Sequence, residues 1–160
     1  SGSKVVFAAY GDVKRNLAKS IPSYLENLKG FTNAQLVMNG VISLTADKFK
    51  DYETATNEME LLNQQLTDHI VELNEIPFII IADDSKFIAE TLNNFLWATF
   101  TRCNPSHDMY GIGSFAKFKH WGSKGSLVID ARVKPHHAPP LIKNEAIEKR
   151  VDELAKKYGF

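Results

Sequence analysis

The segment FIIIADDSKFIAETLNNFLWATFTR, residues 78–102, determines the predicted fold of this chain. Its first five residues, Phe78 to Ala82, are apolar and rich in isoleucine, which predicts a buried strand. Two aspartates and a serine follow, and then apolar residues at helical spacing. In an open α/β sheet, ligand sites form where strands deliver their carboxyl ends to a loop. The segment therefore predicts a strand, a turn that can form a site, and an amphipathic helix.

The helix after this turn is expected to begin at Ser85, because serine is a favourable N-cap residue. Cys103 would be a small residue at its end. Trp97 and Phe100 are interpreted as core residues because they lie at helical spacing. The predicted inner face of the helix consists of Ile88, Leu92, Phe95, Leu96 and Thr99.

Three other apolar runs predict strands, and they alternate with helical segments. These runs are Val5 to Ala9, Gln35 to Leu44, with a bulge or break at Gly40, and Leu127 to Ala131. Alternating strands and helices are typical of layered α/β domains. We therefore predict a three-layer α/β/α domain with a mixed sheet and a C-terminal helical arm.

Three further segments are predicted to be helical. Asp12 to Lys29 would form two short helices, the second with Pro22 in its opening turn, where proline is tolerated. The helix from Asn144 to Tyr158 would either contact a partner subunit or pack on its own domain. The helix from Tyr52 to Leu73 would bury one face, made of Met59, Leu62, Leu66, Ile70 and Leu73.

Two segments are predicted to lack regular structure. Residues 104–124 combine Asn-Pro, Gly-Ile-Gly, four aromatic residues and two histidines without clear periodicity, which predicts a long loop. Pro135, Pro139 and Pro140 predict a stiff connector before the last helix.

The composition indicates one globular domain. The chain has 160 residues and equal numbers of acidic and basic side chains, so its net charge offers no electrostatic footprint for nucleic acid or an anionic membrane. A single cysteine suits a reducing compartment, and no apolar run is long enough to cross a bilayer. We expect a cytoplasmic protein with a cloning scar at residues 1–3, the α/β domain at 4–134, and the connector and helix at 135–160.

The adjacent aspartates Asp83 and Asp84 admit several roles. They could hold Mg²⁺, accept a phosphoryl group or share a proton. Alternatively, one of them caps the following helix, since acidic groups are favoured at helix N-termini.

Other polar residues could also form a site. Asp130 and Arg132 alternate along a strand end, so they would point to the same side as an ion pair or an anion site. Arg102 and Asp108 are further candidates. The glycine-rich segments 111–114 and 122–125 could wrap an anion, although loop flexibility is the simpler interpretation. Adjacent His136 and His137 would point to opposite sides and, with His120, form no recognised zinc pattern.

The order of several short motifs resembles the C-terminal part of the UbiD family of decarboxylases, over about residues 76–142. The motifs are Asp83-Asp84, Leu96-Trp97-Ala98, Thr101-Arg102, Pro105-Ser106-His107-Asp108, Gly122-Ser123-Lys124, Ile129-Asp130-Ala131 and Lys134-Pro135. Asp83-Asp84-Ser85, residues 91–95 and residues 135–140 resemble most the menaquinone-biosynthesis branch of the futalosine route, proposed to act on dihydroxynaphthoate. The ubiquinone-linked branch, which acts on polyprenyl-hydroxybenzoate, usually has a longer acidic cluster where this chain has Ser85 and Lys86.

The resemblance implies a parent enzyme that uses prenylated FMN with a divalent metal (Mn or Mg), potassium and a Glu-Arg-Glu catalytic set. The family holds these groups mainly in the domain preceding this one, and no Glu-Arg-Glu motif occurs here. The resemblance therefore implies that this chain alone is inactive, with no catalytic residue, metal or cofactor of its own. The residues expected to shape a cleft or an interface are Asp83, Asp84, Arg102, Asp108, Lys124, Asp130 and Arg132.

The expected partners are the preceding flavin-binding domain and a second copy of the chain, bound through the C-terminal helix. We expect no nucleic-acid binding and at most peripheral membrane association. Two alternative hypotheses are a stand-alone Mg²⁺-dependent phosphohydrolase or phosphoacceptor at Asp83 and Asp84, and a non-enzymatic interaction module that uses the terminal helix.

Overall fold

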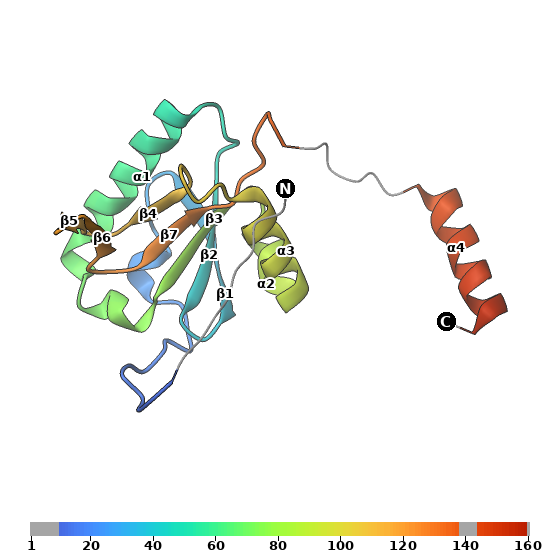
Figure 1. Ribbon diagram of the computed structural model, residues 1–160, viewed down its shortest axis with the longest axis horizontal. Coiled ribbons are helices and arrows are strands. Elements are labelled where there is room, and N and C mark those ends of the chain that lie inside the picture. Colours follow the sequence, from blue (N-terminus) through green and yellow to red (C-terminus); the bar gives the residue numbers. More distant parts are fainter. Residues whose placement is uncertain (1–9, 138–143, 160) are drawn as a thin grey trace.

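A mixed five-stranded sheet forms the centre of the domain (Figure 1). The computed structural model describes residues 10–137 and 144–159. The strands lie in the order β1-β2-β3-β7-β4. The central strands β2, β3 and β7 are parallel, whereas β1 and β4 are antiparallel to their neighbours at the two edges. Their bounds are β1 Phe31–Met38, β2 Val41–Ala46, β3 Phe78–Ala82, β4 Met109–Gly111 and β7 Leu127–Asp130.

Helices cover both faces of the sheet, so the predicted three-layer α/β/α architecture is confirmed. On one face α1 (Tyr52–Leu66) packs Met59, Leu62 and Leu66 against alternate residues of β2 and β3. On the other face α2 (Ser85–Glu90) and α3 (Leu92–Arg102) pack against Ile80 and Ile129. The parallel strands are buried on both faces, which explains their continuous apolar sequences.

The remaining elements are short or lie outside the main sheet. A separate two-stranded sheet consists of β5 (Ser114–Lys117) and β6 (His120–Ser123). The last helix, α4 (Glu145–Tyr158), lies apart from the sheet in Figure 1. No helix in the described part of the chain is long and apolar enough to span a bilayer. Short 3-10 helices occupy Ser23–Leu25, Thr67–His69 and Glu72–Glu75.

Two of the predicted strands and the terminal helix agree closely with the structure. β3 has the predicted bounds, β7 ends one residue early, and α4 follows its predicted range with Asn144 as N-cap. The predicted run from Gln35 to Leu44 is two strands, because Gly40 adopts a positive φ of 74° and turns the chain. A Cβ at Gly40 would also lie 3.1 Å from the backbone oxygen of Glu75, so both the backbone conformation and the space favour glycine there. The predicted strand Val5 to Ala9, residues 1–3 and residues 139–140 lie outside the described residues.

The two helices predicted between Asp12 and Lys29 are wrong. Only the 3-10 turn Ser23–Leu25 forms, directly after Pro22. The backbone around Ala18 is bonded across the fold instead, because Ala18 N–H donates to Glu75 O and Gly40 N–H donates to Ala18 O. These long-range hydrogen bonds replace the ones that a local helix would make.

The helix predicted to start at Ser85 is two helices, and Asp84 caps the first. Asp84 accepts a hydrogen bond from Phe87 N–H. Ser85 is buried and bonds to Asn33 O and Thr45 across the sheet. Thr91 ends α2 in an extended conformation and caps α3. This break turns the second helix, so Ile88, Phe95 and Thr99 are buried as predicted, but Leu92, Leu96 and Trp97 are exposed.

The segment predicted as a long loop, residues 104–124, forms β4, β5 and β6. β4 pairs with β7 at the sheet edge, and β5 and β6 form a hairpin. Glycine suits position 122 of β6, because a Cβ there would come within 2.7 Å of the Phe115 ring. Gly111 and Gly122 therefore allow close packing within strands, whereas Gly113 adopts a positive φ of 62° between β4 and β5.

A cluster of paired charges at the sheet edge

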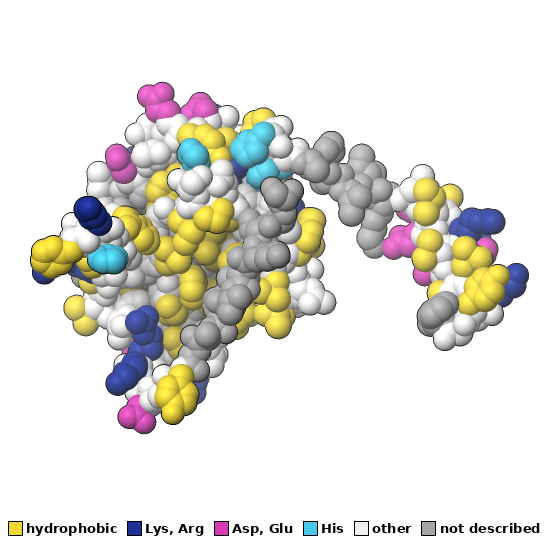
Figure 2. Space-filling model, in the orientation of Figure 1, with side chains coloured by type: hydrophobic (Ala, Val, Ile, Leu, Met, Phe, Trp, Pro, Cys, Tyr) yellow, Lys and Arg dark blue, Asp and Glu magenta, His cyan; other side chains and the backbone are white. Residues whose placement is uncertain are grey.

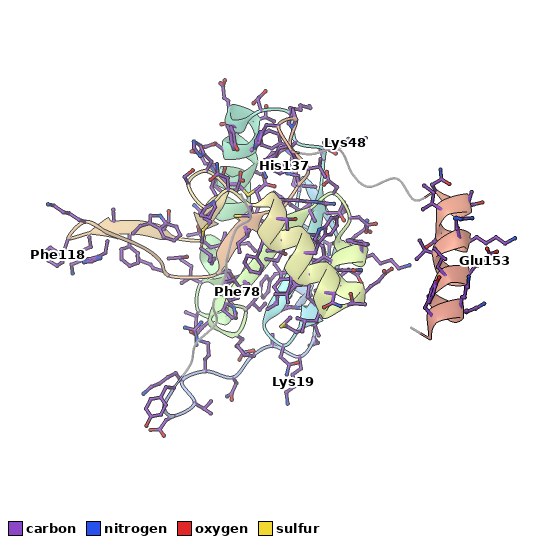
Figure 3. The ribbon with its side chains drawn as sticks, turned by 45° about the vertical axis from the view of Figure 1, so that its right-hand side comes forward. Lys19, Lys48, Phe78, Phe118, His137 and Glu153 are labelled. Atoms are coloured by element: carbon purple, nitrogen blue, oxygen red, sulfur yellow. The ribbon has the colours of Figure 1, made fainter. Side chains whose placement is uncertain are left out.

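Charged side chains gather where β2, β3 and β7 end, and the C-terminal edge of a parallel sheet is the usual place for a site. His137 and Lys48, labelled in Figure 3, mark this edge. The structure brings together six of the seven predicted site residues and adds Glu58 and Lys134. The eight residues, here called the edge cluster, are Glu58, Asp83, Asp84, Arg102, Asp108, Asp130, Arg132 and Lys134.

Arg132 and Asp130 form a fully buried ion pair at the end of β7. Arg132 Nε and Nη2 donate to the two carboxylate oxygens of Asp130 at 3.0 and 2.8 Å. Arg132 Nη1 lies 2.7 Å from Glu58 Oε2 on α1 and donates to Asp47 O at 2.9 Å. The guanidinium therefore links β7 to α1 and to the end of β2, and the ion-pair interpretation of Asp130 and Arg132 is confirmed.

The environment keeps Arg132 charged. Burial alone would lower the pKa of its guanidinium, but hydrogen bonds and negative charge from Asp130 and Glu58 raise the pKa above its ordinary value. A buried ion pair is retained only when its remaining donors are satisfied, and Asp47 O satisfies one of them here.

Lys134 is a second buried cation beside this ion pair. Its ammonium group lies 3.3 Å from Asp108 Oδ2 and 3.9 Å from Asp130 Oδ1. It also donates to the backbone carbonyls of Arg102, Asp130 and Arg132, at 3.3, 2.9 and 3.3 Å. One side chain thus ties the end of α3, the end of β7 and the segment that leaves the sheet.

Asp108 reaches this ammonium from the loop between α3 and β4. Its Oδ2 accepts a hydrogen bond from Asn104 N–H at 2.6 Å, and its backbone carbonyl accepts one from Asp130 N–H. The buried Oδ1 has no hydrogen-bond partner among the residues that the structure describes. Asp108 therefore depends on Lys134 for most of the compensation of its buried charge.

Asp83 and Arg102 lie nearer the surface. Arg102 Nη1 is 3.6 Å from Asp83 Oδ2, which also accepts a hydrogen bond from Val133 N–H at 2.8 Å. The Arg102 guanidinium stacks over the exposed Trp97 ring at 5.1 Å. Asp83 is therefore engaged in an ion pair and Asp84 in a helix cap, as one interpretation of the aspartates proposed.

Aromatic and histidine rings cover the buried charges. Phe49 lies 5.7 Å from the Arg132 guanidinium and 5.3 Å from the Lys134 ammonium. Tyr52 lies 5.1 Å from the His107 ring. Burial, followed by the charge of Lys134, lowers the pKa of His137. Burial and the nearby negative charges of Asp108 and Asp130 raise the pKa of Tyr52.

Cys103 is the C-cap residue of α3 and is buried. Burial, together with the negative charge of Asp108, raises the pKa of its thiol to about 11. The thiol is therefore protonated at neutral pH, which does not suit a nucleophile. This position agrees with the interpretation of Cys103 as a small residue at a helix end.

Lys124 is the predicted site residue that lies elsewhere. It is exposed and comes just before β7, whereas the edge cluster follows the other end of that strand. Ser123 Oγ in the same motif donates to Ile112 O at 2.9 Å, so the motif stabilises the base of the hairpin. Within residues 10–137 and 144–159, no three His, Cys, Asp or Glu side chains are grouped to hold a metal ion.

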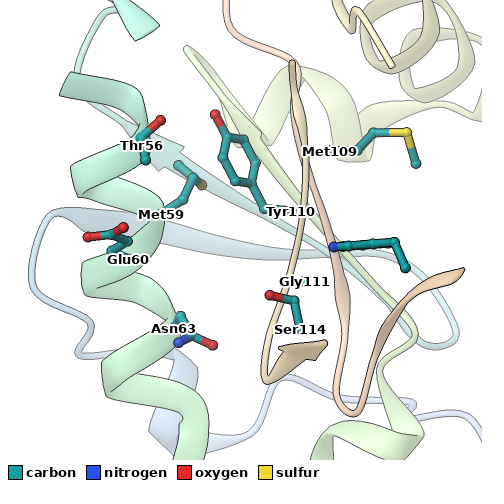
Figure 4. Close-up of a pocket in the computed structure, with 9 residues that line it drawn as sticks. Thr56, Met59, Glu60, Asn63, Met109, Tyr110, Gly111 and Ser114 are labelled. Atoms are coloured by element: carbon teal, nitrogen blue, oxygen red, sulfur yellow. The ribbon is translucent and has the colours of Figure 1, made fainter. Parts of the chain in front are cut away.

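A cavity of about 240 Å³ lies between α1 and the β4–β6 region. Figure 4 shows its α1 wall facing β4 and the start of β5. Glu60 is the only carboxylate among its lining residues, so this cavity lacks the paired acid and base groups of a hydrolytic site. It is lined by Thr56, Met59, Glu60, Asn63, Met109, Tyr110, Gly111, Ser114 and Trp121.

Sequence reasoning missed Glu58 and Lys134 as site residues. Glu58 has no local signal, because it meets Arg132 only through the packing of α1 on the sheet. Lys134 does have a local signal in the sequence, since it continues the alternation of Asp130 and Arg132.

Two curated proteins are similar in sequence to this chain. No protein-family model matches the chain. The chain is 31% identical over 85 residues to a 4-hydroxybenzoate decarboxylase subunit of Chlamydia pneumoniae, and this region covers 53% of the chain and 15% of that protein. It is 24% identical over 158 residues to an uncharacterized protein of Chlamydia muridarum, covering 98% of the chain and 25% of that protein. The chain thus spans a quarter or less of the curated relatives that it matches.

A solved structure is also similar to the chain. It is an evolved dimeric form of the UbiD-class enzyme HmfF from Pelotomaculum thermopropionicum, in complex with prFMN. The match has 18% identity and a TM-score of 0.47, and it covers 79% of this chain and 26% of that one. The motif order of this chain resembles that of the UbiD family, and a curated protein to which the chain is similar is a decarboxylase subunit.

Proposed function

We propose that this chain is the C-terminal domain of a non-oxidative aromatic acid decarboxylase of quinone biosynthesis. The observation that carries this proposal is the 31% identity over 85 residues to a 4-hydroxybenzoate decarboxylase subunit. The chain would complete one side of the active-site cleft, whose other side belongs to a preceding flavin-binding domain. The futalosine branch and a dihydroxynaphthoate substrate are the finer parts of this proposal.

The pairing of the edge cluster supports a shaping role over a catalytic one. Asp130, Arg132 and Lys134 are fully or almost fully buried and hold one another, while Asp83 holds Arg102 and Val133 N–H. A general acid or base must reach a substrate proton, and a buried, paired group does not. In this proposal the cluster fixes the shape of the sheet edge that faces the cleft.

The proposed parent enzyme would use prenylated FMN with a divalent metal and potassium. The charged residues of the edge cluster do not fit the flavin phosphate as they stand, because their cations are engaged with carboxylates of the same cluster. The proposal therefore assigns the cofactor to the preceding domain, and no step of the chemistry to a residue of this chain.

The isolated chain is expected to release no CO₂. The measurement incubates the chain with prenylated FMN, Mn²⁺ and K⁺, and with 4-hydroxybenzoate or dihydroxynaphthoate as substrate. The full-length parent under the same conditions is the positive control. Turnover by the isolated chain would contradict the proposed division of labour, and an inactive parent would contradict the decarboxylase assignment.

The terminal helix supports a second part of the proposal, self-association of the parent. Ile147, Val151, Leu154 and Tyr158 follow a spacing of four, three and four residues, so they line one face of α4. All four are exposed, between 43% and 65%. Figure 2 shows this helix with apolar side chains uncovered. An apolar stripe of this kind is the seam by which two helices pack.

Changing Val151 to glutamate is expected to convert a self-associated chain into a monomer, because a charge in the centre of the seam would be buried unpaired. Light scattering after gel filtration measures the mass. The matched control is Lys149→Ser, on the opposite side of α4, which should keep the mass of the wild-type chain. An equal mass for Val151→Glu and wild type would argue against self-association through this helix.

A further inference from the structure

The β5–β6 hairpin projects from the body of the domain. Its two strands pair with each other in a sheet of their own. Figure 3 shows the hairpin extending away from the main sheet, with Phe118 at its far end. Phe118 is 84% exposed, the highest value among the phenylalanines that the structure describes. The tip of the hairpin therefore carries an exposed aromatic ring.

The turn at this tip carries residues that its geometry disfavours. Phe118 and Lys119 have φ angles of 51° and 65°, the conformation of a type I′ turn. Asn-Gly is the favoured pair in that turn, because side chains with a bulky Cβ are strained at positive φ. Hairpin stability does not explain a Phe-Lys tip, so another interaction of these side chains is the better explanation.

Partly exposed aromatic side chains occur on both faces of the hairpin as well as at its tip. Phe115 lies across Gly122 on one face and is 44% exposed. Trp121, opposite Ala116 on the other face, is 52% exposed, and the rest of its ring lies beside Gly111 and lines the cavity against α1. A lipid interface surrounds an inserted element on every side.

The charge around the hairpin is one-sided. Between Met109 and Ile129 the sequence contains Lys117, Lys119, Lys124 and His120 but no aspartate or glutamate. The formal charge of this segment is therefore positive, although that of the whole chain is zero. The Lys117 ammonium lies 5.2 Å from the Phe118 ring, so charge and apolar surface occur together at the tip. Figure 2 shows apolar and basic side chains together at this end of the molecule.

We propose that the β5–β6 hairpin docks on an anionic lipid bilayer. Phe118 enters the boundary between head groups and acyl chains, and Trp121 lies at the level of the head groups, where tryptophan is favoured. Lys117, Lys119 and Lys124 contact the negatively charged lipid head groups. The inference goes beyond the proposed decarboxylase role and does not depend on it.

Co-sedimentation of the full chain with sucrose-loaded vesicles tests the proposal. Vesicles of phosphatidylcholine with 30% phosphatidylserine are compared with pure phosphatidylcholine in 0.1 M NaCl. We expect partitioning at least about tenfold stronger on the anionic vesicles, since each lysine contributes roughly fivefold near such a surface. Raising the salt to 0.5 M should weaken binding, because charges at the membrane surface are then screened.

Two variants assign the binding to the hairpin. Phe118→Asn with Lys119→Gly supplies the favoured turn residues and should lower partitioning roughly 50-fold, because it removes one inserted ring and one charge. Its melting temperature should stay the same or rise by roughly 2 to 4 °C, since the turn strain is relieved. Lys117→Gln with Lys119→Gln should lower partitioning roughly 25-fold. The matched controls are Leu92→Ser and Lys86→Gln, exposed residues on α3 and α2, which should bind as wild type does.

Several outcomes would overturn the proposal. They are equal binding to anionic and neutral vesicles, no binding to either, and unchanged binding of the two hairpin variants. Loss of self-association in those variants, without any vesicle binding by the wild-type chain, would assign the hairpin to a protein interface instead.

Discussion

Replacing Arg132 with methionine is expected to lower the free energy of unfolding by about 3–5 kcal/mol, the usual cost of breaking a buried ion pair from one side. The variant would leave the buried Asp130 carboxylate without its guanidinium and Asp47 O without its donor. Methionine fills much of the volume, so the loss reports on charge more than on packing. Since small domains are stable by roughly 5–15 kcal/mol, this is a large fraction of the total.

Urea unfolding followed by circular dichroism measures this change. The matched control is Arg150→Met on α4, where the arginine is exposed and the expected change stays within roughly 0.5 kcal/mol. Adding Asp130→Asn to Arg132→Met should recover part of the loss, because the uncompensated charge is then removed. Equal stability of Arg132→Met and wild type would show that the pair contributes nothing to the fold.

Replacing Lys134 with methionine is expected to cost a similar amount, about 3–5 kcal/mol. Asp108 would keep a buried charge with only Asn104 N–H as a described partner. The carbonyls of Arg102, Asp130 and Arg132 would also lose a shared donor. Because these carbonyls belong to α3, β7 and the segment beyond it, the loss should loosen their connection as well as lower global stability.

Two measurements separate these effects. Urea unfolding gives the global loss, and amide hydrogen exchange at residues 130–134 reports local opening. Lys48→Met is the control, since Lys48 is exposed at the same edge. The double variant Lys134→Met with Asp108→Asn should be more stable than Lys134→Met alone, as the unpaired carboxylate is gone. If the double variant loses the sum of the two single losses, Lys134 and Asp108 are not coupled.

The local sequence correctly predicts the elements whose residue pattern follows from a single local factor, such as burial on both faces or a helix cap. β3 and β7 are continuous apolar runs because both their faces are buried, and their bounds were predicted to within a residue. α4 was predicted because its periodicity and its capping Asn144 are local signals. The same holds for Asp130 and Arg132, whose alternation placed both side chains on one side of a strand end.

The errors lie where distant parts of the chain compete with local preference. Residues 12–19 resemble a helix, but the backbone of Ala18 bonds to Glu75 and Gly40. The predicted core includes Leu92, Leu96 and Trp97. The break at Thr91 changes the direction of the helix, so these three side chains are exposed. Residues 104–124 lack periodicity because their strands are only three or four residues long. β4 nevertheless pairs with β7 through backbone hydrogen bonds at the sheet edge.

By itself, the sequence determined the layered α/β class, the central strands and the terminal helix, and the order of its motifs resembles that of the UbiD family. Only the tertiary structure decided what the charged residues do. Glu58 on α1 and Asp108 before β4 meet the charged residues at the end of β7, and no spacing along the chain encodes such a meeting. The physical reason is that burial makes each of these charges dependent on a distant partner, and burial is a property of the folded chain.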